Sequence, residues 1–172
     1  MSLTTLDIKE PGLNTLPPGV ERYVVEGGGL TGIQILPDDE IEIINNEGNQ
    51  LCEISAFNKD GKSDLAILGL KEIKENSKIK KILFKKDETS LQALLQLKKR
   101  NLNIEKSKSS LIFDKETKAG EIIKLKSKDK CYCIFAAPGE KMMVHEQNPS
   151  TELTVIVKRS VIKKDKENII LL

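Results

Sequence analysis

Apolar and polar residues alternate along the first third of the chain, which is the period expected for half-buried β-strands. Turn signals at residues 27–29 and 37–39 divide this region into runs. Three strands are predicted after Glu21, with the apolar pairs Tyr23 and Val25, Ile33 and Ile35, and Ile41 and Ile43.

Residues 50–57 predict a fourth strand of another kind. Apolar residues occupy both of its faces, as expected for a strand that is covered on two sides. A turn at residues 58–62 follows, and then residues 63–70, which could form one helical turn or a loop. Residues 80–86 (KKILFKK) predict a further strand, whose lysines would protect a sheet edge rather than contact nucleic acid.

One principal helix is predicted over residues 87–101. Thr89 and Gln92 have the spacing of a capping box, and the basic residues 98–100 suit the negative end of a helix dipole. An apolar stripe at helical spacing should pack on the sheet, and it consists of Leu91, Leu94, Leu95 and Leu102.

The last third of the chain returns to strands. Residues 131–137 (CYCIFAA) are nearly all apolar and predict a central strand. The remaining predicted strands cover residues 109–113, 121–126 and 151–159. We therefore expect a mainly β protein, either a compact antiparallel β barrel or a two-sheet sandwich, with one principal packed helix at about 87–101.

A length of 172 residues suits one ordinary domain. Residues 1–20 are rich in proline and glycine, which excludes a helix or central strand there, so we expect an N-terminal arm before a single β-rich domain over residues 21–172. The terminal residues 168–172 (NIILL) fit either a last strand or a domain border in a longer protein.

Composition argues against several classes of partner. With 28 basic and 26 acidic residues, the net charge of +2 gives no strong field, and an aromatic content of 3% without tryptophan leaves little to stack on nucleic-acid bases. The first ten residues (MSLTTLDIKE) lack the basic-then-apolar order expected of a signal peptide, and the sequence has no apolar run of about 20 residues. We expect a cytoplasmic protein that binds neither nucleic acid nor membrane and that could form a homo-oligomer.

The three cysteines and the single histidine are weak candidates for chemistry. A zinc site would have to gather Cys52, His145 and one residue of the Cys131/Cys133 pair without any C-x₂-C knuckle, so core thiols and no metal are the favoured interpretation. Catalysis could use Cys52 as nucleophile with Glu53 and His145 as proton carriers. An exposed loop histidine is the simpler alternative.

Two short polar segments precede strands, at residues 47–53 (EGNQLCE) and 145–151 (HEQNPST). Gln50, Glu53 and Asn148 could anchor a small amine or carboxylate ligand. They could equally cap turns, since Asn-Pro is a common turn dipeptide.

The order of these segments over residues 20–159 resembles the urea carboxylase-associated domain family. The resemblance rests on Gly48-x-Gln50, the A-P-G turn at residues 137–139, and Asn148-Pro149-x-Thr151. It is greatest for the form fused to glycine-cleavage T-protein-like aminomethyltransferases. The lysine-rich residues 71–108 lack the cysteines and histidine of the stand-alone members.

The resemblance implies an accessory β domain in one-carbon metabolism, associated with a folate-dependent aminomethyltransferase domain or chain. This chain would be non-catalytic by itself and would hold no cofactor, and tetrahydrofolate would belong to the associated transferase. No complete catalytic constellation supports naming this chain a transferase. The alternative is a small-molecule-binding or hydrolase/deiminase domain that acts on urea-, guanidine- or amine-type compounds.

Overall fold

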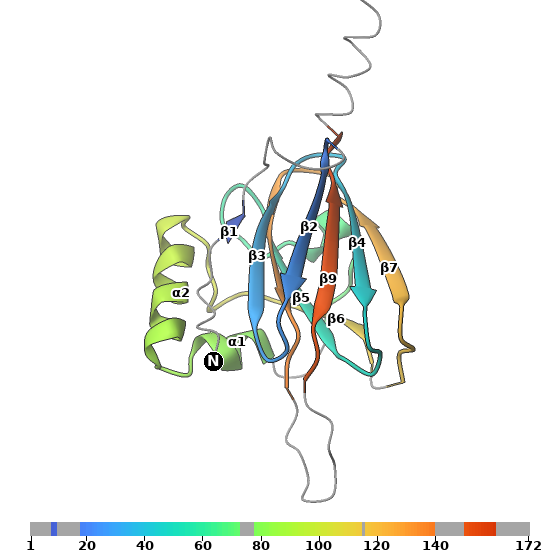
Figure 1. Ribbon diagram of the computed structural model, residues 1–172. Coiled ribbons are helices and arrows are strands. Elements are labelled where there is room, and N and C mark those ends of the chain that lie inside the picture. The colour runs from blue at the N-terminus through green and yellow to red at the C-terminus, as the bar shows by residue number, and fades with distance from the viewer. Residues whose placement is uncertain (1–7, 10–17, 73–77, 115, 140–149, 161–172) are drawn as a thin grey trace, which may run out of the picture.

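Two β-sheets packed face to face form the body of the protein, with two helices at one side (Figure 1). The computed structural model describes residues 8–9, 18–72, 78–114, 116–139 and 150–160. The elements in these residues are β1 (Ile8–Lys9), β2 (Val20–Val25), β3 (Leu30–Ile35), β4 (Glu40–Asn45), β5 (Cys52–Phe57), the 3₁₀ turn η1 (Leu65–Leu68), α1 (Lys78–Leu83), α2 (Glu88–Lys99), β6 (Ser110–Phe113), β7 (Glu121–Lys126), β8 (Cys131–Ala136) and β9 (Leu153–Lys158).

The strand order decides between the two predicted architectures. One sheet has the order β1-β3-β8-β5-β6 and the other has the order β2-β9-β4-β7, so neither closes into a barrel. The sandwich is therefore confirmed. Strand β8 lies between β3 and β5, which confirms its predicted central position. The pairings are antiparallel except at β1, a two-residue edge strand from the proline-rich N-terminal region that runs parallel to β3.

The alternating apolar residues fill the space between the two sheets. Leu153, Val155 and Val157 of β9 are fully buried there, together with Ile41 and Ile43 of β4. Fully burying a side chain of this size contributes roughly 1.5–3 kcal/mol. The strand predicted within residues 151–159 is thus confirmed, and this layer supplies the main driving force for pairing the sheets.

A second apolar layer covers the outer face of the five-stranded sheet. Phe57 and Ile134 of the sheet contact Ile79, Leu83 and other residues of α1 and α2. All six residues of β5 are buried because the inter-sheet core covers one face and this layer covers the other. The prediction of a strand covered on two sides is confirmed.

The predicted strand at residues 80–86 is wrong, because this segment belongs largely to helix α1. Ile79 and Leu83 are one helical turn apart and both are fully buried against the sheet. Lysine favours a helix energetically, so the flanking lysines suit a short surface helix as well as a sheet edge. The helix begins where the backbone N–H of Lys78 donates to the Glu53 carboxylate at 2.8 Å.

The principal helix is confirmed, but its cap differs from the prediction. The carboxylate of Asp87 accepts a hydrogen bond from the backbone N–H of Ser90 at 2.7 Å, which makes Asp87 the N-cap instead of the Thr89 capping box. None of the described helices is long and apolar enough to cross a membrane.

The predicted leucine stripe of α2 is half right, because Leu94 and Leu102 pack in the layer between helices and sheet, whereas Leu91 and Leu95 do not. The buried face consists of Ser90, Ala93 and Leu97, while Leu91 and Leu95 are 56% and 54% exposed. Small side chains allow the helix to approach closely, and the Ser90 hydroxyl donates to the carbonyl of residue 82 at 2.8 Å. The sheet therefore selects the face with the smaller residues.

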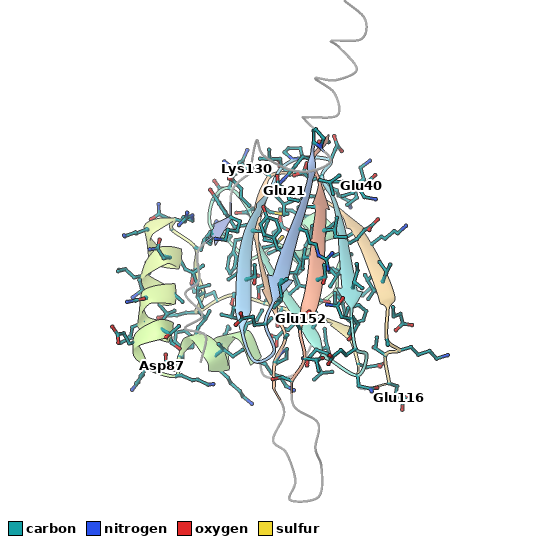
Figure 2. All side chains as sticks on the ribbon, in the orientation of Figure 1. Glu21, Glu40, Asp87, Glu116, Lys130 and Glu152 are labelled. Carbon is teal, nitrogen blue, oxygen red and sulfur yellow. The ribbon has the colours of Figure 1, made fainter. Side chains whose placement is uncertain are left out.

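A buried ionic cluster closes the upper end of the sandwich, where Figure 2 labels Glu21. The guanidinium of Arg159 donates to both carboxylate oxygens of Glu21 at 3.0 and 2.8 Å, to Asp39 at 2.8 Å and to the Gln34 carbonyl at 2.7 Å. The Tyr23 hydroxyl also donates to Glu21. Removing one partner from a buried pair of this kind typically costs about 3–5 kcal/mol.

Tyr23 gives this cluster a signature at alkaline pH. Burial, followed by the hydrogen bond to Glu21, raises its pKa from 10.0 to about 12. Because the unfolded chain loses this proton first, the free energy of unfolding should fall as the pH rises from about 10 to about 12. Urea unfolding across this range should show a shallower fall for Tyr23→Phe than for Tyr132→Phe. Equal slopes in the two variants would contradict this.

Candidate functional site

The side chain of Gln50 joins three chain segments at the lower end of the sandwich. Its Oε1 accepts a hydrogen bond from the backbone N–H of Thr151 at 2.8 Å. Its Nε2 donates to the carbonyls of Pro138 at 3.0 Å and Leu51 at 2.8 Å. Gln50 is only 4% exposed. It thus ties the start of β5 to the chain after β8 and to the chain before β9.

The turn before Gln50 is fixed by its backbone. Gly48 has a φ of 79°, and a Cβ there would lie 2.7 Å from the backbone nitrogen of Ala119, so a larger residue would clash. Asn49 also adopts a left-handed conformation, with a φ of 57°, and its N–H donates to the Thr117 carbonyl at 2.7 Å. The segment EGNQ therefore forms a turn after which the Gln50 side chain is buried.

The glycine turn between β2 and β3 completes this end of the molecule. Gly28 has a φ of 79°, which confirms the predicted turn, and its N–H donates to the Ala137 carbonyl at 2.7 Å. A Cβ on Gly27 would lie 2.3 Å from the carbonyl oxygen of Ser150. A glycine is therefore required for close packing beside the start of β9.

Two buried oxygen atoms at this end have no hydrogen-bond partner within the described part of the chain, Asn45 Oδ1 and Thr151 Oγ1. The other polar side-chain atom of Asn45, Nδ2, donates to the Gln50 carbonyl at 2.8 Å. Buried polar groups are nearly always paired, so such atoms call for a bound water or ligand. We call Asn45, Gln50 and Thr151 the polar corner.

The outer side of the polar corner is held by a separate pair. Asn46 Nδ2 donates to the Thr154 hydroxyl at 2.9 Å, and that hydroxyl also lies 3.2 Å from Asn46 Oδ1. Asn46 Nδ2 also lies 3.4 Å from the carboxylate of Glu152, which Figure 2 labels beside the lower end of β9. These contacts fix the chain at the end of β4 to β9, so the polar corner lies next to two paired strands.

The chemistry of the polar corner favours a ligand with N–H groups. The Oδ1 atom of an asparagine can only accept a hydrogen bond, whereas a threonine hydroxyl can accept or donate. A charged side chain lies beside this region, since the carboxylate of Glu152 is 3.4 Å from Asn46 Nδ2. An ammonium, guanidinium or urea group could donate to either oxygen, and so could an ordered water.

Glu53 is a predicted ligand-binding residue, but among the described residues its side chain bonds to different partners from those of Gln50. It faces the helix layer, where its carboxylate accepts from the Ser109 hydroxyl at 2.5 Å and from the Lys78 N–H at 2.8 Å. The contact with Lys78 anchors the start of α1, and the contact with Ser109 anchors the residue just before β6. The binding role predicted for Glu53 is untested, whereas its role as a helix cap follows directly from these contacts.

Cys52 and Glu53 point to opposite faces of β5, because neighbouring residues of a strand alternate. Cys52 belongs to the inter-sheet core. Burial, with a further contribution from the charge of Glu53, raises the pKa of the Cys52 thiol well above its ordinary value. A neutral buried thiol is a poor nucleophile, so this placement disfavours the predicted catalytic role.

The other two cysteines face the same core from β8, with their sulfur atoms 3.6 Å apart. Among the described residues, no three His, Cys, Asp or Glu side chains gather in a way that could hold a metal. His145 and Asn148, the remaining predicted site residues, lie outside the described residues. So do Glu146 and Gln147 of the second polar segment.

The sequence indicated half of this site. The two polar segments named in the sequence meet, since the backbone N–H of Thr151 donates to Gln50, and this holds for the described residues 150–151 of the second segment. Asn45 was missed. A usable signal was present, because Asn45 follows Ile41 and Ile43 at alternate positions and therefore falls in the inward register of β4.

Comparison with known proteins gives one relevant similarity. The chain is 34% identical over 157 residues to trimethylamine-oxide aldolase from Ruegeria pomeroyi. The alignment covers 91% of this chain but 20% of the aldolase, so the chain spans about a fifth of that relative's length. No family model matches the chain. The chain thus has a homologue named for a small amine-derived compound, and the finer assignment to the urea carboxylase-associated family is unconfirmed.

The Gln50 clamp predicts a large loss of stability when its amide is removed. Gln50→Met has a similar size, but it leaves the Thr151 N–H and two carbonyls without their partner. Each unsatisfied buried group costs about 1–3 kcal/mol, so the three groups should together cost about 3 kcal/mol or more in urea unfolding. The matched control, Gln92→Met on the exposed side of α2, should stay within about 0.5 kcal/mol of wild type. Equal stability of the two variants would show that the clamp is energetically unimportant.

Proposed function

We propose that this sandwich is a small-molecule domain that binds an amine-type compound at the polar corner. The observation that carries the proposal is the pair of buried oxygens without a partner among the described residues, Asn45 Oδ1 and Thr151 Oγ1. Both belong to residues fixed by Gln50, so the acceptors are preorganised before a ligand arrives. The homology to trimethylamine-oxide aldolase supports a ligand from amine metabolism.

The same geometry favours one of the candidate ligand classes. A protonated amine would donate to both oxygens, and hydrogen bonds to a charged group contribute about 1.5–3 kcal/mol each. A carboxylate would instead face the acceptor oxygen of Asn45 and the nearby Glu152, and both contacts would be repulsive. Of the amine and the carboxylate that the sequence left open, we therefore propose the amine.

A role within a larger enzyme is the second part of the proposal. The relative is about five times as long as the aligned region, so its homologous segment works beside other parts of a longer protein. An accessory domain beside a folate-dependent aminomethyltransferase, with tetrahydrofolate bound by that transferase, is a more specific form that nothing yet tests. In a cytoplasmic enzyme of this kind the sandwich would hold or deliver an amine, and none of the described residues is assigned a step in transfer chemistry.

Thr151→Val tests the binding site without removing a side-chain contact seen among the described residues. The change deletes the Oγ1 hydroxyl and keeps the branched shape, so stability without ligand should be unchanged or raised by about 1 kcal/mol. Thermal shift of wild type with dimethylammonium, methylammonium, guanidinium or urea at 100 times the dissociation constant should reflect about 2.7 kcal/mol of added stability. Thr151→Val should lose that shift.

Two controls make the outcome specific. Thr154→Val removes a hydroxyl that does have a partner, so it should lower stability by about 1 kcal/mol while keeping ligand binding. Tetramethylammonium has the charge of the amines but no N–H group, so it should give no shift. Equal shifts from tetramethylammonium and dimethylammonium, or full binding by Thr151→Val, would overturn the proposal. No shift with any of the four compounds would leave the two oxygens to ordered water and would also overturn it.

A further inference from the structure

The outward face of α2 carries an exposed apolar stripe. Leu91 and Leu95 are one helical turn apart and more than half exposed, although buried positions are where leucine is most often found. Ser90, Ala93 and Leu97 hold the opposite face of the helix against the sheet. Figure 1 shows α2 at one side of the sandwich, with no further labelled element beyond it in that view. The stripe is thus a surface available for contact.

Charged residues extend this stripe in both directions. At about 100° per residue, Glu88, Leu91, Leu95 and Lys98 all fall within roughly 80° of the helix circumference. The acidic residue stands at the N-terminal end of the stripe and the basic residue at the C-terminal end, and both are exposed. The order along the helix is therefore acid, leucine, leucine, base.

We propose that this face pairs with the same face of a second copy of the chain, with the two α2 helices antiparallel. Two-fold symmetry about position 93 sets Leu91 against the second copy's Leu95, and it sets Glu88 against the second copy's Lys98. Both pairs recur in reverse on the other side of the axis, as an isologous contact requires. A parallel arrangement would set like charges together, so the order of charges fixes the orientation.

The contact is small, which determines its expected strength. A single helix from each copy buries less than the roughly 1,200–2,000 Å² of a standard stable interface, so the dimer should be weak and concentration-dependent. Its ion pairs are exposed, so salt should weaken it further. The proposal uses none of the residues of the polar corner, and its outcome is therefore independent of ligand binding.

Charge exchange tests the pairing directly. In Glu88→Lys, two lysines of one copy face two lysines of the other, and in Lys98→Glu two glutamates face two glutamates. Each single variant should raise the dimer dissociation constant about tenfold, because two favourable contacts become repulsive. Sedimentation equilibrium from micromolar to millimolar protein, at low salt, measures this constant.

Mixing the two single variants should restore dimers. The lysine introduced at position 88 of one chain then meets the glutamate introduced at position 98 of the other, and the unchanged Lys98 of the first chain meets the unchanged Glu88 of the second. The double variant E88K/K98E should self-associate as wild type does, because the exchange preserves both pairs.

Two checks make the result specific to the stripe. Lys81→Glu reverses a charge on α1, away from the stripe, and should have no effect on the dissociation constant. Circular dichroism establishes that each surface variant is folded. Monomers throughout the concentration range, dimers insensitive to the exchange, or no recovery in the mixture would overturn the proposal, and would leave the stripe to a different partner.

Discussion

The buried amide of Gln50 is the contact on which the lower end of the molecule depends. It satisfies the carbonyl of the adjacent Leu51 and, in segments distant in sequence, the carbonyl of Pro138 and the N–H of Thr151. A buried amide of this kind cannot be replaced without leaving groups unpaired. The Gln50 carbonyl accepts from Asn45, so the same residue also orients the asparagine whose Oδ1 has no partner among the described residues. The acceptor pair proposed to bind a ligand therefore exists because Gln50 holds both of its members.

The two ends of the sandwich satisfy their buried polar groups in different ways. At the upper end, Arg159 meets two carboxylates and a carbonyl, so every nitrogen of the guanidinium has a partner. Because all of its nitrogens already bond to groups of the protein, the guanidinium is suited to a structural role rather than to ligand binding. At the lower end, Asn45 and Thr151 each keep one oxygen without a partner among the described residues. Buried acceptors of this kind are rare in folded proteins, and they make the lower end the one suited to recognition.

Periodicity predicted the strands because a half-buried sheet imposes an alternation that few other structures share. It failed at residues 80–86, where lysines flanking a short apolar run suit a helix and a strand equally well. It also failed for half of the predicted leucine stripe, because the sheet buries the small residues Ser90 and Ala93 and leaves Leu91 exposed. Choosing a helix face requires knowledge of the surface opposite it, and a local pattern does not contain that knowledge.

The polar corner shows the same limit. The motif resemblance indicated Gln50 and Thr151, and a hydrogen bond does join the two. The sequence could not predict whether Asn45 Oδ1 has a hydrogen-bond partner, because that depends on the positions of all its neighbours in space. The local signal was a polar residue, Asn45, at an inward position of β4. A polar residue at a position that an apolar one would normally fill is typical of a functional site.

A crystal structure of the protein with dimethylammonium tests the central claim most directly. The account predicts the ligand nitrogen within hydrogen-bond distance of both Asn45 Oδ1 and Thr151 Oγ1, with the Gln50 contacts unchanged. A structure in which water alone bridges these two oxygens while the amine binds elsewhere, or not at all, would contradict it.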